Sequence, residues 1–311
     1  MSMSGLRAAV GVHLAARRAR GYRLEGHEQL LRSFLDSLEA RGETRITVPA
    51  AVAFATAPAG TARAWHAQRL AAVRSFASYV HALDPAAADP VPDGLIPGSI
   101  PRRVPYLYSG EETARLMAAA GALASPVLAA GMRTLIGLLA STGIRSGEAF
   151  ALDASDLDIT GQVLTVTGKH GRKRLIALHP SAAAALSDYL QFRGQHAAGG
   201  ATALLIGHAG RRLNRNMART IFRSLAIGCG LEPQPGCRSP RLHDFRHAFA
   251  VSTLTDAHRQ GLDVDARIAV LATHLGHVSP AHTYWYLTVA PGLADAVSER
   301  VALYYRGGNF R

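Results

Sequence analysis

The distribution of proline is the feature that most constrains how this chain folds. Six of the fifteen prolines in its 311 residues lie close together: Pro85, Pro90, Pro92, Pro97, Pro101 and Pro105. Each removes a backbone hydrogen-bond donor and biases the preceding residue towards extended conformations, so this stretch cannot be a helix or a central strand. We therefore predict a semi-extended linker at 85–105 between an N-terminal domain, 1–84, and a C-terminal domain, 106–311.

Residues 1–84 show the apolar spacing of short amphipathic helices. The side chains expected to face inwards are Leu31, Phe34, Leu35 and Leu38 in one segment and Leu70, Val73, Phe76 and Val80 in another. Thr47 with Pro49 predicts the start of a further helix between these two segments, and Thr61 is the expected cap of the last helix. With the basic segment before Gly21, these patterns predict a small four-helix module. The arginines expected on its outer face are Arg63, Arg69 and Arg74.

Beyond the linker, helical and strand periodicities alternate. Ser109 with Glu112 is the signature of a capping box. Helices are expected at about 110–121, 126–141, 180–193, 214–228, 243–257, 262–275 and 293–304, the second of them ending at Gly143. Two β-branched runs, 163–167 and 174–178, flank a Gly-Lys-His-Gly turn, which is the pattern of a β-hairpin. The predicted fold is mainly α with a small antiparallel β-sheet (α+β).

The charge balance indicates a polyanion partner. The chain has 34 Lys and Arg against 22 Asp and Glu, a formal net charge of +12 at pH 7. Basic side chains bind nucleic acid by releasing condensed counterions, although charge alone only modestly favours this over a basic protein without that role. Cys229 and Cys237 lack disulfide or metal spacing and predict free thiols in a reducing cytoplasm. We expect neither a membrane span nor a secretory signal, because no apolar stretch has the required length and continuity.

Several polar residues beyond the linker have an ordinary structural interpretation when each is taken alone. Arg145 could simply pair with Glu148. His243 and His247 are spaced to share a zinc ion, but Arg246 lies on the same helix face, and a guanidinium beside a divalent cation is unfavourable. The others could be helix-end or core side chains: His274, His277, Tyr284, Trp285 and Tyr286.

Order and spacing favour a different interpretation. The series runs as Arg145 in Thr-Gly-Ile-Arg with Glu148 after it, Lys169 on the hairpin, His243 and Arg246 in Leu-His-Asp-Phe-Arg-His, His277 in Leu-Gly-His, and Tyr286 nine residues later. It resembles the tyrosine recombinases, the phage-integrase family, over residues about 106–290. The linker and the helical module are similar to that family's SAM-like core-binding domain. Two departures are His170, where the family often has glycine in the turn, and Gly147, a weak helix former.

The resemblance implies a catalytic site of six residues: Arg145, Lys169, His243, Arg246, His277 and Tyr286. The two guanidiniums would bind the nonbridging phosphate oxygens and stabilise the charge that builds up there. His243 would be the base for the Tyr286 hydroxyl, and His277 would bind an oxygen. The leaving 5′ oxygen needs a proton, which lysine can supply and arginine cannot. Lys169 is therefore the expected acid, and Lys173, the other lysine of the chain, a phosphate contact.

Two further expectations concern the site. No metal or other cofactor is expected, because two guanidiniums provide the charge stabilisation that a Mg²⁺ ion would otherwise give. Tyr284 is the rival nucleophile, but side chains two residues apart on a helix point about 200° away from each other. The family spacing favours Tyr286, which leaves Tyr284 and Trp285 as expected packing residues.

The expected function is site-specific recombination: cleavage and rejoining of double-stranded DNA through a 3′-phosphotyrosyl intermediate and a Holliday junction. We expect the protein to act on DNA as a homotetramer, or as a tetramer formed with a second recombinase. The expected location is the bacterial cytoplasm, in association with the nucleoid. Neither a membrane nor a small-molecule substrate is expected as a partner. The role would be integration, excision or transposition of a mobile element, or Xer-type dimer resolution. The helix at 293–304 would dock on a neighbouring protomer or on its own domain. A type IB topoisomerase, a catalytically silent DNA-binding protein and a helical regulator are the alternatives.

Overall fold

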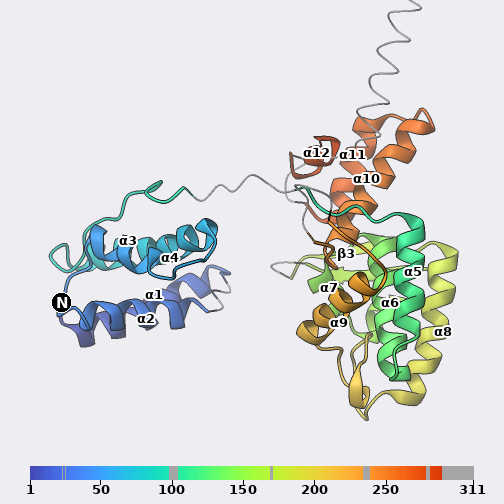
Figure 1. The fold of residues 1–311 in the computed structure, drawn as a ribbon, viewed down its shortest axis with the longest axis horizontal. Helices are drawn as coiled ribbons and strands as arrows, with labels where there is room; N and C mark the ends of the chain where they lie inside the picture. The colour runs from blue at the N-terminus through green and yellow to red at the C-terminus, as the bar shows by residue number, and fades with distance from the viewer. Residues whose placement is uncertain are drawn as a thin grey trace, which may run out of the picture. The chain divides into compact units, whose positions relative to one another are not determined.

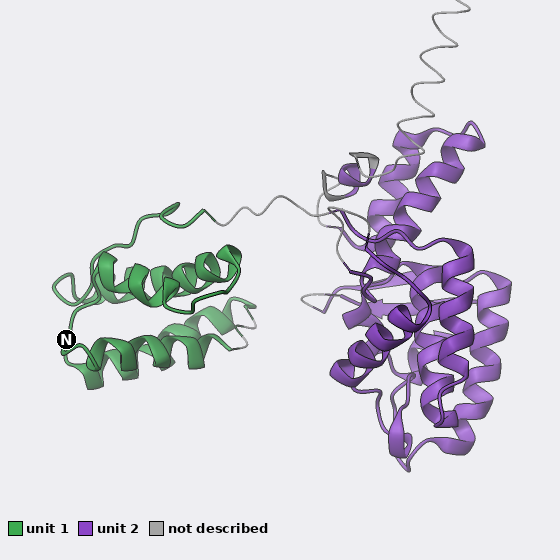
Figure 2. Ribbon diagram, viewed as in Figure 1, with its two compact units in different colours: residues 1–102 green, residues 103–311 purple. Residues whose placement is uncertain are grey.

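The computed structural model describes residues 1–22, 24, 26–97, 104–168, 171–233, 239–277 and 281–288. The chain divides into two compact units, Met1–Arg102 (unit 1) and Arg103–Arg311 (unit 2), shown in Figure 2. The division falls within the proline-rich segment at 85–105. Each unit has its own hydrophobic core and is described by itself.

Unit 1 is built from helices. They are α1 (Met3–Ala19), α2 (His27–Glu39), α3 (Val48–Thr56) and α4 (Arg63–Leu83). The eight apolar residues that the spacing placed inwards are all buried in one core, together with Leu6, Val10 and Leu14 of α1. Thr47 caps α3 as predicted, because its side chain accepts a hydrogen bond from the backbone N–H of Ala50.

The predicted cap of α4 is wrong. The helix begins after Ala62, whose side chain has no hydrogen-bond acceptor. Thr61 lies one residue earlier, and its hydroxyl donates to the carbonyl of Pro58 at 2.9 Å. Threonine hydroxyls bond readily to nearby backbone groups, so the preceding turn has taken the group that a cap would use.

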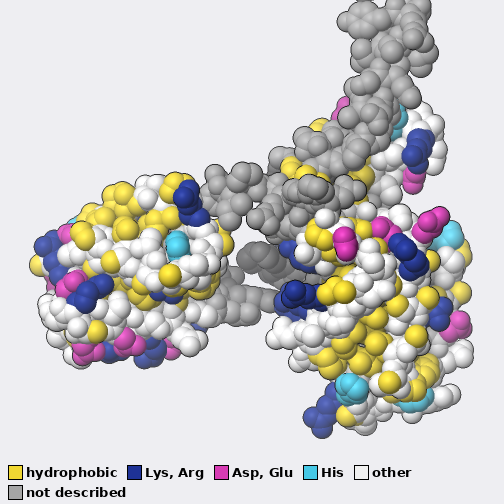
Figure 3. Space-filling view, in the orientation of Figure 1, with side chains coloured by type: hydrophobic (Ala, Val, Ile, Leu, Met, Phe, Trp, Pro, Cys, Tyr) yellow, Lys and Arg dark blue, Asp and Glu magenta, His cyan; other side chains and the backbone are white. Residues whose placement is uncertain are grey.

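The outward arginines of α4 are less available than their spacing predicted. Arg69 lies over the Phe54 ring, 4.0 Å from its centroid, and donates to the Phe54 carbonyl. Arg74 forms an ion pair with Asp93, while Arg63 is exposed as expected. On the face drawn in Figure 3, basic and acidic side chains of unit 1 are interspersed. Part of the positive charge of this unit is therefore offset locally by carboxylates.

Unit 2 combines helices with a small sheet (Figure 1). Its helices are α5 (Gly110–Gly121), α6 (Pro126–Thr142), α7 (Ser146–Ala151), α8 (Pro180–His196), α9 (Arg215–Gly228), α10 (Asp244–Arg259), α11 (Val264–Leu275) and α12 (Ala281–Thr288), with 3-10 turns at Ala154–Asp156 and His208–Gly210. The strands are β1 (Leu157–Asp158), β2 (Val163–Thr167) and β3 (Lys173–Ala177), antiparallel in the order β1-β2-β3. The predicted mainly α fold with a small antiparallel sheet is confirmed. The predicted helix at 293–304 lies outside the described residues.

Local signals set the ends of these elements. Ser109 and Glu112 form the predicted capping box, in which the side chain of each accepts a hydrogen bond from the backbone N–H of the other. α6 ends at Gly143, where φ is +61° and a Cβ would lie 2.4 Å from the Phe249 ring. Glycine alone fits both the backbone conformation and the close approach. β3 begins one residue earlier than predicted, at Lys173.

Two hydrophobic clusters organise the described part of unit 2. The larger joins α5, α6, α8, α9 and the sheet. The smaller joins α10, α11 and α12 through Ala250, Leu254, Ile268, Leu271, Leu275 and Tyr286. These three helices lie together at one end of the unit (Figure 1). None of the helices within the described ranges is both long and apolar enough to cross a membrane.

Candidate active site

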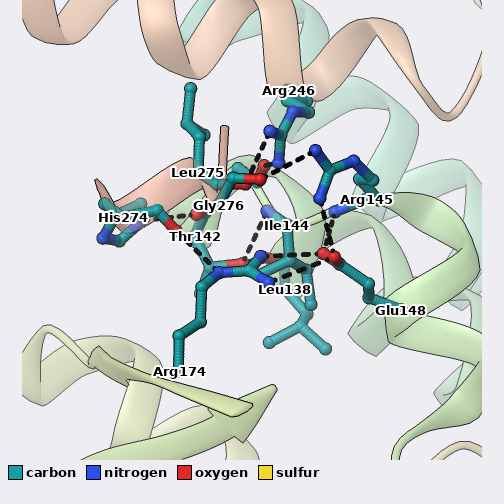
Figure 4. Close-up of polar contacts among 11 residues, drawn as sticks. Leu138, Thr142, Ile144, Arg145, Glu148, Arg174, Arg246, His274, Leu275 and Gly276 are labelled. Atoms are coloured by element: carbon teal, nitrogen blue, oxygen red, sulfur yellow. Dashed lines mark hydrogen bonds and ion pairs between the residues drawn. The ribbon is translucent and has the colours of Figure 1, made fainter. Parts of the chain in front are cut away.

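The end of α11 is the point at which several charged residues of unit 2 meet. Its last carbonyls each accept a hydrogen bond from a different arginine (Figure 4): His274 from Arg174 at 2.8 Å, Leu275 from Arg246 at 2.7 Å and Gly276 from Arg145 at 3.2 Å. Carbonyls at a helix C-terminus lack partners within the helix and carry the negative end of its dipole, so they attract cations. Three distant segments of sequence are thereby held together at one helix end.

Arg145 enters this cluster from the turn between α6 and α7. Its guanidinium donates to Oε1 of Glu148 at 2.9 Å, and its backbone N–H donates to Oε2 of the same carboxylate, also at 2.9 Å. The pair between Arg145 and Glu148, which the sequence suggested as an ordinary structural role for Arg145, is therefore present. The side chain of Arg145 is still 34% exposed, so its pairing with Glu148 leaves room for a second anionic partner.

Arg246 lies deeper, in the first turn of α10, and is only 2% exposed. It donates to the carbonyls of Gly143, at 3.1 Å, and Leu275, and so joins the end of α6 to the end of α11. Burial and the positive charge of Arg145 lower the pKa of Arg246 to about 10, which leaves the guanidinium charged at neutral pH. Both acceptors are neutral, so an anion placed beside Arg145 and Arg246 would be strongly stabilised.

Two imidazoles lie at the start of α10. His243 immediately precedes the helix, and burial, followed by the positive charge of Arg246, lowers the pKa of His243. A neutral imidazole can accept a proton. His247, one turn further on, lies edge-on to His243 with ring centroids 5.2 Å apart, and its ring lies 5.6 Å from that of Tyr286. Among the described residues, no group of three or more His, Cys, Asp or Glu side chains is placed to hold a metal ion.

His277 and Tyr286 face each other where the chain passes from α11 to α12. Their rings are nearly parallel, with centroids 6.3 Å apart, and Nδ1 of His277 lies 2.8 Å from the Thr283 hydroxyl. Tyr286 is 2% exposed, whereas Tyr284 is 46% exposed, so the two tyrosines point in different directions from α12 as helical spacing predicts. The expectation that Tyr284 packs in the core is wrong. Trp285 does pack, partly buried, against the smaller cluster.

The structure brings five of the six predicted site residues into this region. Besides burial, the positive charges of Arg246 and Arg145 lower the pKa of His243. Tyr286 acts on the pKa of Arg246 in the direction opposite to burial. His277 joins the group through its ring contact with Tyr286. The sixth, Lys169, belongs to the connection between β2 and β3 and lies outside the described residues.

The sequence prediction missed Arg174, which β3 contributes to the same cluster. Its two terminal nitrogens donate to the two oxygens of Glu148, at 3.1 and 2.8 Å. Burial alone would raise the pKa of Glu148, but hydrogen bonds from Arg174 and Arg145 outweigh it and hold the pKa below its usual range. Strand periodicity was the available signal, because Arg174 lies two residues before the buried Ile176 and so shares its face. A charged residue on that face requires a polar partner.

Comparison with known proteins identifies the family of this chain. The model of the phage integrase family matches residues 108–292. A putative integrase/recombinase of Sinorhizobium fredii, y4rB, is 38% identical over 307 residues, which cover 96% of this chain and 98% of the relative. The tyrosine recombinase XerC of Mycobacterium tuberculosis is 34% identical over 251 residues, which cover 79% of each protein.

Solved structures share the fold. The XerH site-specific recombinase bound to a palindromic difH substrate has a TM-score of 0.67 at 18% identity, over 91% of this chain and 80% of that one. The Tn1549 transposon integrase in complex with transposon right end DNA has a TM-score of 0.65 at 18% identity, over 97% and 100%. The sequence relatives and the family model extend the likeness from fold to family. This chain belongs to the phage integrase family of tyrosine recombinases, enzymes that cleave and rejoin DNA.

Proposed function

We propose that this enzyme is a site-specific recombinase that cuts DNA with Tyr286 and holds the scissile phosphate with Arg145 and Arg246. The observation that carries the proposal is the convergence of these two guanidiniums on adjacent carbonyls at the end of α11. A planar guanidinium matches the nonbridging oxygens of a phosphodiester. Charge grows on those oxygens during the attack, so guanidiniums that are already fixed stabilise the transition state more than the ground state.

The proposed cleavage is a transesterification. The Tyr286 hydroxyl gives its proton to His243, and its oxygen attacks the phosphorus to form a 3′-phosphotyrosyl bond. The bond from phosphorus to the 5′ oxygen breaks, and that oxygen takes a proton from Lys169. His277 would hydrogen-bond a nonbridging oxygen. Rejoining reverses these steps with a different 5′-hydroxyl, so the covalent intermediate conserves the bond energy and no ATP, metal or other cofactor enters the scheme.

We further propose that strand exchange proceeds through a Holliday junction in a homotetramer, in the bacterial cytoplasm, for integration, excision or transposition of mobile DNA. The likeness to the integrase/recombinase y4rB along nearly the whole chain supports this role. Xer-type resolution of dimers is the second candidate, supported by 34% identity to XerC. Unit 1, whose helices α1 and α4 carry arginines and no Asp or Glu, would bind duplex DNA as a core-binding domain.

Recombination can be tested once the target sequence has been recovered from DNA trapped covalently on the protein. Two copies of that sequence on one supercoiled plasmid should yield excised or inverted products and a four-way junction intermediate. A plasmid with one copy should yield only intermolecular products. Relaxation of a plasmid that carries no copy, without strand exchange on the two-copy plasmid, would instead identify a topoisomerase.

The pH profile of cleavage should report His243. Burial and the charge of Arg246 lower the pKa of His243 from its ordinary value of about 6.5. The imidazole therefore stays neutral as the pH falls to that value and starts to take up a proton only at lower pH. We therefore expect a cleavage rate that is flat from neutral pH to about that value and falls about tenfold per pH unit further down. His243→Gln should be slow and lack this acidic limb. His247→Gln is the matched imidazole control and should keep it; loss of the limb in that variant alone would reassign the base.

A further inference from the structure

The guanidinium of Arg174 forms hydrogen bonds to residues that surround the proposed site. Its Nε donates to the carbonyl of His274, and both terminal nitrogens donate to Glu148 in a two-pronged pair. The side chain is 14% exposed. The backbone of Gly276 lies directly against it, because a Cβ added there would come within 3.2 Å of Nη1 and 3.3 Å of Cζ. β3 is thus tied to α7 through a carboxylate and to α11 through a carbonyl.

We propose that Arg174 is a positioning residue that leaves the charge of Arg145 available to the phosphate and keeps its guanidinium correctly oriented. This inference rests on the proposed function of Arg145. Arg174 would act through Glu148 and would not touch the DNA.

The distribution of charge separates Arg174 from the other two arginines at the end of α11. Arg246 donates to neutral carbonyls and keeps its full positive charge for an anion. Arg174 meets both oxygens of Glu148, the geometry in which a guanidinium and a carboxylate neutralise each other most completely. Arg174 therefore has little charge to offer a phosphate, although it lies beside residues that do.

Sharing of Glu148 protects the charge of Arg145. With Arg174 in place, the guanidinium of Arg145 reaches the carboxylate through Nη1 alone, and its Nη2 reaches Gly276. Without Arg174, Arg145 would be the one arginine among the described residues still bonded to the Glu148 carboxylate. The carboxylate could then turn to form a two-pronged pair with Arg145, which would draw that guanidinium off the Gly276 carbonyl and neutralise it.

The same contacts hold the hairpin against the arginines. Arg174 pairs across the sheet with Val166, and a Cβ added at Gly168 would lie 3.7 Å from both Arg174 Nη1 and Glu148 Oε1. Gly168 directly precedes Lys169 in the sequence. Arg174 is therefore suited to set the approach of the hairpin as well as the orientation of Arg145.

The test compares the rate of covalent capture at saturating DNA between the wild type, a single variant and a double variant. Arg174→Gln should slow cleavage about 100-fold, the effect of losing one preorganised donor, with DNA affinity changed less than about threefold. Removing the freed carboxylate as well, in Arg174→Gln with Glu148→Gln, should restore at least about tenfold of that loss. A merely structural Arg174 would not show this recovery, since the second substitution removes a further buried contact.

The controls keep the possible failures apart. Arg193→Gln removes another half-buried arginine fork, which donates to the carbonyls of Ala203 and Ala201, and should lower the melting temperature without slowing cleavage. Arg174→Lys keeps the charge without the fork and should still be about tenfold slow, which provides a readout if the glutamine variant does not fold. Wild-type rates in both Arg174 variants, or a double variant slower than Arg174→Gln, would overturn the positioning role. Absence of a covalent adduct in the wild type would instead refute the proposed function.

Discussion

Replacing Tyr286 with phenylalanine is expected to abolish covalent capture of DNA while leaving DNA binding intact. The ring of Tyr286 is buried in the cluster of α10, α11 and α12, and phenylalanine fills the same space, so the fold should persist. Only the attacking oxygen is lost, and the rate of adduct formation should fall by at least about 10⁴-fold. Denaturing gels of labelled duplex measure the adduct, and a gel-shift titration on the same duplex measures binding.

Tyr284→Phe is the matched control for this substitution. Tyr284 is largely exposed on the same helix and should form the adduct at the wild-type rate. An adduct that survives denaturation in Tyr286→Phe, or that disappears in Tyr284→Phe, would show that the nucleophile has been assigned to the wrong tyrosine.

Lys169→Arg is expected to slow cleavage by about 10²–10⁴-fold, the usual contribution of a general acid. Arginine keeps the positive charge but cannot release a proton near neutral pH, so the 5′ oxygen would have to leave as an alkoxide. A substrate with sulfur in place of that oxygen needs no proton, since a thiolate is a good leaving group. Its cleavage by Lys169→Arg should approach the wild-type rate, measured as adduct formation on both substrates.

Lys173→Arg is the control for the lysine experiment. Lys173 is exposed at the first position of β3, and its replacement should change the rate on either substrate by less than about threefold. If sulfur substitution brings no recovery to Lys169→Arg, that lysine binds the DNA without delivering the proton. Recovery in Lys173→Arg instead would make Lys173 the acid.

Much of the fold could be predicted from the sequence because the signals are local. A capping box, a left-handed glycine and an alternating strand each depend on only a few neighbouring residues, so the starts of α5 and β2 and the end of α6 are close to their predicted places. The failure at Thr61 has a local cause as well. A threonine can cap the helix that follows or bond back to the preceding turn, and the sequence does not determine which bond forms.

The candidate site, like the fold, could be predicted from the sequence only in part. The order of motifs suggested Arg145, Arg246 and Tyr286, and the helical period separated Tyr286 from Tyr284. Most of the contacts that hold these residues could not be predicted, because they join side chains to backbone carbonyls far away in the sequence, as in the bond from Arg145 to Gly276, 131 positions away. Side-chain chemistry gives no indication of which carbonyl an arginine will meet. Arg174 could have been recognised as half-buried from the period of β3, but not as the partner of Glu148.

Anchoring through main-chain carbonyls affects how this enzyme can vary in sequence. Every residue type supplies the same carbonyl, so substitutions at His274 and Leu275 leave the acceptors for Arg174 and Arg246 in place. A change in the length of α11 is different. Inserting or deleting one residue would turn its terminal carbonyls by about 100° around the helix axis and move the acceptors of all three arginines at once. The length of α11 should therefore be far less variable than the identity of its last side chains.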